Sequence, residues 1–157
     1  MRFKSTAAFS FQGGCSLLRE ESAQVSAELL IVIAIIGLLS TLAVVALGSA
    51  RVKARDSKRL ADLKQLQTAL ELYYTDQNDY PAGAGISLGD AANACLNSTG
   101  FQATGCASPY MGQVPVDPKV GNYTYTLGIG SYTVNATLEG TVNGLAGAIT
   151  LSPAGIQ

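Results

Sequence analysis

The chain has 157 residues, of which 48% are hydrophobic and 13% charged, and its formal net charge is −1. This length allows one domain plus a membrane anchor, and the composition is too apolar for a disordered chain. Histidine is absent, which excludes Ser–His and Cys–His catalysis, histidine ligation of metals and the usual proton shuttle near neutral pH.

The first predicted element is a helix over the apolar run of residues 29–47, which contains no charged side chain. At 1.5 Å per residue it would span roughly 28 Å, close to the thickness of a bilayer core. A cleaved secretory signal, a plain signal anchor, and an anchor preceded by a cleavage site are the alternatives. A secretory signal has a shorter apolar region of about 7–15 residues, whereas the helical pattern here continues beyond the run.

A basic segment, residues 51–64, follows the run. It holds six basic and two acidic side chains, a balance of +4, whereas residues 65–157 hold one basic and six acidic side chains, a balance of −5. The simplest interpretation is a solvated collar between membrane and head. Anionic lipid headgroups, acidic neighbouring subunits and DNA are alternatives, and of these we do not expect nucleic acid. The positive-inside rule would place this segment in the cytoplasm.

The helix is predicted to continue as an amphipathic segment. Apolar residues recur at helical spacing, which gives one face for a core: Leu60, Leu63, Leu66, Leu70 and Tyr73 or Tyr74. We expect the helix to run from about Val25 to Thr75 and to stop ahead of Pro81, because a proline disfavours a helical residue before it.

The rest of the chain is predicted to form strands. "NYTYTLG" and "SYTVNATLE" alternate between apolar and polar residues, with "GIGS" as a tight turn between them. Asn143–Gly144 predicts a hairpin into a third strand, "LAGAITL". Residues 82–121 are expected to form a loop region with one short helix near "LGDAANACL". The fold class is therefore α+β, a long N-terminal helix packed on a small antiparallel sheet.

The run "ELLIVIAIIGLLSTLAVVAL", followed by "ARVKARDSKRLADLKQLQTALELYYTDQNDYP", resembles the N-terminal half of type IV pilins and type II secretion pseudopilins. The resemblance covers about residues 24–81. In addition, "VPVDPKVGNYTYT" is similar to the proline–aspartate–glycine loop of the major pseudopilins. The resemblance implies a structural subunit of a homo-oligomeric helical filament, not an enzyme. We expect no cofactor, and the sequence supplies no candidate metal-site residues.

The resemblance also implies processing. A prepilin peptidase would remove a leader so that the glutamate lies four residues after the new first residue, and counting back from Glu28 places the cut between Ala23 and Gln24. The domains would then be a cleaved leader, residues 1–23, a transmembrane and filament-core helix, residues 24–50, and an extracytoplasmic head, residues 51–157, that includes the second half of the helix.

Glu28 stands at the entrance of the apolar run. A carboxylate within a bilayer costs about 2.5–3.5 kcal/mol, so it is usually there for function. The resemblance implies that the new α-amine of Gln24 in one subunit approaches Glu28 of a neighbour and sets the axial register of the filament. The simpler alternative is a helix-start residue favoured by the helix dipole.

Three cysteines leave one unpaired thiol in the full chain. Cys15 lies in the proposed leader, so that cleavage leaves Cys95 and Cys106 as a pair, which we expect to be joined outside the cytoplasm. Three Asn-x-Ser/Thr motifs give candidate glycosylation acceptors, although so short a pattern often arises by chance: Asn97, Asn122 and Asn135.

The leading hypothesis is a subunit of a type IV pilus-like surface filament. The alternatives are a pseudopilin of a type II secretion system and a membrane-anchored binding module that never polymerises. We expect a single-pass protein of the cytoplasmic membrane with its head outside, which then joins an extracellular filament or a periplasmic pseudopilus. The implied partners are other copies, the prepilin peptidase, the assembly machinery in the membrane, and lipid before assembly.

Overall fold

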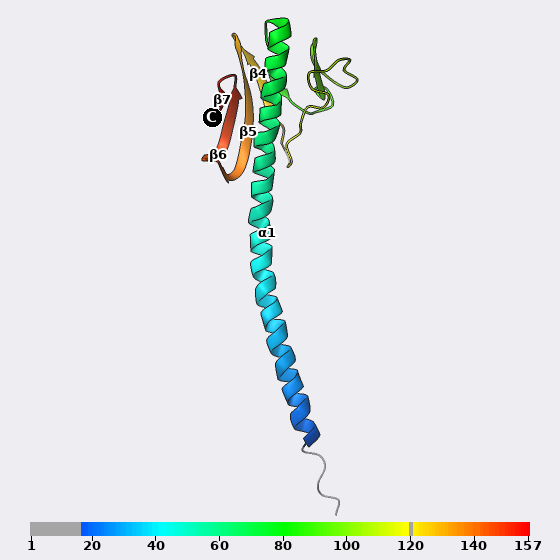
Figure 1. Cartoon of the computed structure of the whole chain (residues 1–157), viewed down its shortest axis with the longest axis vertical. Coiled ribbons are helices and arrows are strands. Elements are labelled where there is room, and N and C mark those ends of the chain that lie inside the picture. The colour runs from blue at the N-terminus through cyan, green and yellow to red at the C-terminus, as the bar shows by residue number, and fades with distance from the viewer. Residues whose placement is uncertain (1–16, 120) are drawn as a thin grey trace, which may run out of the picture. The chain divides into compact units, whose positions relative to one another are not determined.

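The computed structural model describes residues 17–119 and 121–157, and within the N-terminal helix it describes side chains from Ala27 onward. That helix, α1, runs from Leu17 to Gln77 (Figure 1). It ends at Asn78, whose φ of 57° lies in the left-handed region, three residues ahead of Pro81. The predicted stop is confirmed, whereas α1 begins earlier than Val25. The first 16 residues of the proposed leader, including Cys15, lie outside the described residues.

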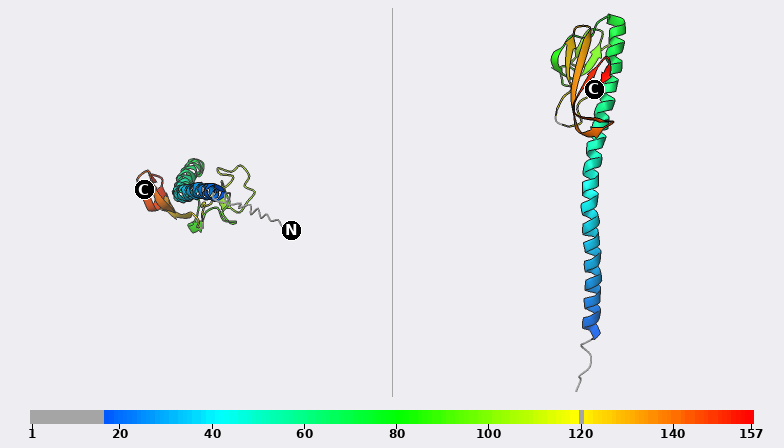
Figure 2. Two further views of the ribbon diagram at one scale, coloured as in Figure 1. Left: turned by 90° about the horizontal axis from the view of Figure 1, so that it is seen from below. Right: turned by 90° about the vertical axis from the view of Figure 1, so that its left-hand side faces the viewer.

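The chain divides into two compact units, Met1–Ala46 and Leu47–Gln157. The second unit contains a five-stranded antiparallel sheet with the strand order β1-β4-β5-β6-β7. Its strands are β1 (Ala84–Ser87), β4 (Thr124–Gly128), β5 (Ser131–Val142), β6 (Leu145–Ser152) and β7 (Gly155–Ile156). A separate hairpin pairs β2 (Cys95–Asn97) with β3 (Gly100–Gln102). Figure 2 shows the sheet beside the C-terminal part of α1, which confirms the α+β class.

Both predicted tight turns are present. Ile129 and Gly130 connect β4 to β5, and Asn143 and Gly144 connect β5 to β6. Asn143 and Gly144 have φ values of 53° and 81°, the positive values that a two-residue hairpin of this kind requires. The turns fix the register of β5 with both neighbours, so each apolar residue of β5 has a defined side of the sheet.

One hydrophobic core joins α1 to the sheet. Along β5 the side chains alternate between buried and exposed as predicted, with Tyr132 and Val134 fully buried. The helix contributes the residues predicted from its period, and most of them are buried: Leu63, Leu66, Leu70 and Tyr73, with Leu60 partly buried. Tyr123 and Tyr125 from the start of the sheet complete the centre of this core.

The short helix expected near "LGDAANACL" is wrong, because this segment forms turns. Gly89 has a φ of 76°, and a Cβ placed there would lie 2.7 Å from the carbonyl oxygen of Pro115. The carboxylate of Asp90 then accepts the N–H groups of Ala92 and Asn93 at 3.0 and 2.9 Å. Such a local side-chain bond competes with helix formation. The three short strands β1, β2 and β3 lie in a region that the sequence pattern predicted to be a loop.

Candidate functional site

The first candidate site is the apolar surface of α1. Its large apolar side chains between Leu29 and Leu47 are 50–74% exposed. This is the one helix in the described part of the chain that is long and apolar enough to cross a membrane by length and composition, with a mean hydropathy of 3.0 in its most apolar window. So large an exposed apolar surface is typical of a segment that lipid or other protein covers.

The predicted processing and register residues lie on this helix. Glu28 is exposed and directly precedes the apolar run, which begins at Leu29. Ala23 and Gln24 belong to the part of α1 whose side chains lie outside the described residues, so the structure neither supports nor opposes a cut between them.

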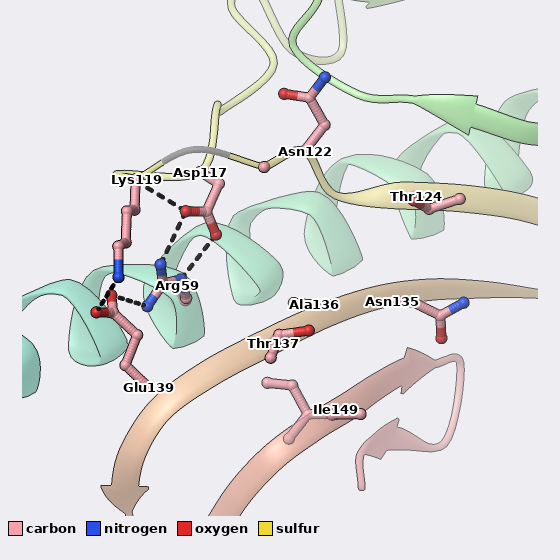
Figure 3. Close-up of a pocket in the computed structure, with 12 residues that line it drawn as sticks. Arg59, Asp117, Lys119, Asn122, Thr124, Asn135, Ala136, Thr137, Glu139 and Ile149 are labelled. Carbon is pink, nitrogen blue, oxygen red and sulfur yellow. Dashed lines mark hydrogen bonds and ion pairs between the residues drawn. The ribbon is translucent and has the colours of Figure 1, made fainter.

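The second candidate site is a buried ionic cluster centred on Arg59, which is only 2% exposed. Its guanidinium donates to both carboxylate oxygens of Asp117, at 2.7 and 2.8 Å. It also donates to Asp56 at 2.7 Å and to Glu139 at 2.9 Å. Figure 3 shows Arg59 on the helix reaching both Asp117 in the loop before β4 and Glu139 on β5. One side chain therefore fastens α1 to two distant parts of the sheet domain.

Two more cations complete the cluster. Arg55 donates to both oxygens of Glu139 at 2.7 Å, and the Lys119 ammonium lies 3.0 Å from the same carboxylate. Arg55, Arg59 and Lys119 thus balance Asp56, Asp117 and Glu139. These contacts hold the pKa of Glu139 well below its ordinary value, mainly through Arg55 and then Lys119. Arg59 lowers the pKa of Asp117 in the same way.

Asp56 connects the cluster to the backbone of β5. The pairing of β5 with β6 is irregular between Thr137 and Thr141, and there the N–H groups of Glu139 and Gly140 donate to the Asp56 carboxylate at 3.0 and 2.8 Å. Burial by itself would raise the pKa of Asp56, but these donors and Arg59 outweigh it and lower the pKa. A fully buried carboxylate thus satisfies backbone donors that the sheet leaves unpaired.

The interpretation of the whole basic segment as a solvated collar is therefore wrong for Arg55 and Arg59. Both belong to the folded head, because their partners Asp117 and Glu139, outside the helix, lie 58 to 84 positions away in the sequence. Lys58 also pairs within the head, with Asp62 at 3.1 Å. Arg51 and Lys53 are exposed, as a collar requires.

An open pocket of about 420 Å³ lies beside the cluster. Half of its other lining residues carry amide or hydroxyl side chains, namely Asn122, Thr124, Asn135 and Thr137, and the rest are glycine, alanine and Ile149 (Figure 3). The charged groups at its edge are already paired with one another. Among the residues that the structure describes, no group of three or more acidic or cysteine side chains is placed to hold a metal ion. The pocket therefore offers polar contacts and no free acid, base or nucleophile.

Cys95 and Cys106, the predicted pair, are joined by a disulfide in the structure. The bond links β2 to the irregular chain after β3, and Leu96 beside it exchanges backbone hydrogen bonds with Met111 at 2.9 and 3.2 Å. Cys95 is 2% exposed. The disulfide thus fastens a loop that has few other regular contacts.

The three candidate glycosylation residues lie in different settings. Asn97 ends β2, and its side-chain oxygen accepts the N–H and hydroxyl of Thr99 at 3.0 and 2.7 Å. Asn135 lies within β5, where its oxygen accepts the Thr150 hydroxyl. Asn122 is exposed just before β4.

The comparisons with known proteins agree with this architecture. The family described as "Type II secretion system (T2SS), protein G" matches residues 46–137, more than half of the chain. A search of curated proteins and a search of solved structures each found no significant match. The matched residues begin at the end of the apolar run and contain β4, the disulfide and every residue of the ionic cluster except Glu139, so the match does not depend on apolar composition alone. The chain therefore belongs to the protein G family of the type II secretion system.

Proposed function

We propose that this protein is a pseudopilin, a structural subunit that assembles through α1 into a periplasmic filament of a type II secretion system. The observation that carries this proposal is the family match over residues 46–137, since protein G is a major pseudopilin. It favours the secretion alternative over the surface pilus that the sequence analysis placed first. The family is structural rather than catalytic, which agrees with the lack of histidine.

The exposed apolar surface of α1 supports assembly. Before assembly, lipid would cover these side chains, and in the filament the helices of other copies would replace lipid. Either environment is compatible with an uncharged run from Leu29 to Leu47, because backbone donors and acceptors are satisfied within the helix.

Processing and orientation form the second part of the proposal. A prepilin peptidase would cut between Ala23 and Gln24, and the new amine would pair with Glu28 of a neighbouring copy. The head would lie outside the cytoplasm. The Cys95–Cys106 bond supports this side, because disulfides persist in oxidising compartments. The opposing positive-inside signal carries less weight, since whole domains translocate largely regardless of charge.

A gene deletion in the source cell tests the function. We expect the deletion to abolish export of secreted proteins while leaving surface filaments intact, and expression of the chain to restore export. Lost surface filaments with normal export would instead identify a pilus subunit. Normal export together with normal filaments would favour a binding module that does not polymerise.

Mass spectrometry of the membrane-bound chain tests the processing. The expected N-terminus is Gln24. An intact Met1, or a terminus after residue 47, would refute both the cleavage site and the filament proposal.

A further inference from the structure

Two pairs of exposed charges of opposite sign lie near the two ends of the part of α1 that belongs to the unit Leu47–Gln157, in addition to the exposed Lys58 and Lys64 between them. Arg51 and Lys53, the basic pair, lie at the start of this part of the helix; of the acidic pair, Asp76 lies in its last turn and Asp79 two residues beyond its end at Gln77. In the described part of the chain, no ion pair within 4 Å involves any of these four residues. By contrast, all the charged groups of the buried cluster are matched with one another.

The two pairs cannot meet within one molecule. Lys53 and Asp76 are 23 residues apart on a continuous helix, a distance of about 35 Å at 1.5 Å per residue. That separation is several times the screening length of about 8 Å at physiological salt. The attraction between the two pairs therefore contributes almost nothing to the stability of a single chain, in which Asp76 accepts a hydrogen bond from the Tyr110 hydroxyl at 2.8 Å.

Helix geometry favours a contact between two copies instead. At 3.6 residues per turn, Lys53 and Asp76 lie about 140° apart around the helix axis, on nearly opposite sides. Two parallel copies offset by about 35 Å along their axes can therefore bring Lys53 of one beside Asp76 of the other. Leu72, which is 51% exposed one turn before Asp76, would add an apolar contact at the same place.

We infer that the acidic pair of one copy docks on the basic pair of a second copy, an inference that rests on the proposed filament function. The two pairs have opposite charge, contain two charged side chains each and are exposed in the single chain. Neighbouring subunits thus meet at their heads as well as along the apolar run, and this contact sets an axial offset of about 35 Å between them.

Charge reversal in the full-length chain tests the contact. Lys53→Glu and Asp76→Lys should each lower the filament yield about two- to tenfold, as expected for the loss of a few exposed ion pairs per subunit. The combined variant keeps the net charge of the natural chain and should recover most of the yield. If the combined variant stays as poor as the single ones, the docking is refuted, and Lys53 then acts on lipid or within its own subunit.

Cysteine cross-linking gives a second, direct readout. In a chain with Cys15→Ser, the pair Lys53→Cys and Asp76→Cys should form disulfide-linked dimers and longer ladders upon mild oxidation in membranes and filaments. The control pair Thr133→Cys and Asp76→Cys, with Thr133 exposed on β5, should not. Filaments that form without cross-links refute this docking alone, whereas cross-linked chains without filaments refute the proposed function alone.

Discussion

Arg59 lies among three carboxylates at a place where water cannot screen it. A buried ion pair repays the cost of removing its charges from water only if the geometry is good and the other polar groups are satisfied. Both conditions hold here, since the guanidinium makes four short hydrogen bonds, two to Asp117 and one each to Asp56 and Glu139. Removing the guanidinium would leave buried carboxylates without a counter-ion. 

The first prediction follows from this cluster. Arg59→Met should lower the free energy of unfolding of the head by about 3–5 kcal/mol, because Asp56 and Asp117 would remain buried and unpaired. Urea unfolding of the full chain in detergent, followed by the near-ultraviolet circular dichroism of the buried tyrosines, measures it. Lys64→Met, at an exposed position on the same helix, is the matched control and should change stability by less than about 0.5 kcal/mol. A loss below about 1 kcal/mol for Arg59→Met would contradict this account of the cluster.

The second prediction concerns pH. The pKa values of Asp56, Asp117 and Glu139 are lowered in the folded head, so the unfolded chain binds more protons than the folded one in acid. Their stabilisation is therefore complete above the unfolded pKa of about 4 and is lost as the pH falls toward the folded values. Urea midpoints should stay nearly constant from about pH 7 to 5 and decline below about pH 4. In the Asp117→Asn variant, the urea midpoint should fall less steeply with decreasing pH. A pH dependence equal to that of the natural chain would show that Asp117 does not contribute to the loss of stability in acid.

At the scale of elements, the loop that contains β2 and β3 has the weakest support of its own. Each strand has three residues, and the two pair only with each other apart from the backbone bonds of Leu96 to Met111. The loop between the cysteines is rich in Asn, Ser, Thr and Gly, and only its Leu96 and Phe101 reach the hydrophobic core. We therefore expect the disulfide to supply much of its order.

The third prediction is that Cys95→Ser or Cys106→Ser costs about 3 kcal/mol of head stability, since the bond closes a loop across 11 positions. Hydrogen exchange should rise in residues 94–111 and remain unchanged in the apolar part of α1. Cys15→Ser is the control and should have no effect on the mature chain. Peptide mapping without reductant checks the bond itself, and two free thiols in the native protein would contradict it and place the head in the cytoplasm.

At the scale of the whole molecule, one continuous helix belongs to both compact units, and its apolar side chains are exposed in the first unit and buried in the second. Its apolar run, Leu29 to Leu47, is exposed in the single chain, whereas Leu63, Leu66 and Leu70 are fully buried in the head. The head can thus fold by itself around its own core, and the run depends on lipid or on other copies for cover. Assembly is therefore expected to act through the run and through exposed head charges without rearranging the core.

The fourth prediction tests Glu28 in assembly. Glu28→Ala should leave the chain cleaved and inserted, with insertion slightly improved, because a charge is removed from the membrane segment. Filament yield should fall, since the amine of a neighbouring Gln24 loses its partner. Ser40→Ala, an uncharged change within the same run, is the control. An unchanged yield for Glu28→Ala would show that this pair does not set the register.

Local patterns were sufficient to predict much of this fold. The helix, its buried face, the alternation of β5 and the two tight turns depend on period and on turn residues close together in the sequence. The pairing of Cys95 with Cys106 was also predictable, because only one pair remains after the proposed cleavage. The apolar run and its glutamate were enough for the family resemblance.

Only the tertiary structure identified the buried ionic cluster. Arg59 looked like one of six similar basic residues, because its partners Asp117 and Glu139 lie 58 and 80 positions away. The same holds for Gly89, whose turn depends on a close approach to Pro115 from a distant part of the chain. The sequence alone determines the hydrophobic periodicity, the residues that form turns and the number of cysteines, which are local or countable properties. Which charges become buried partners depends on how the sheet packs on the helix, and that packing is a property of the folded chain.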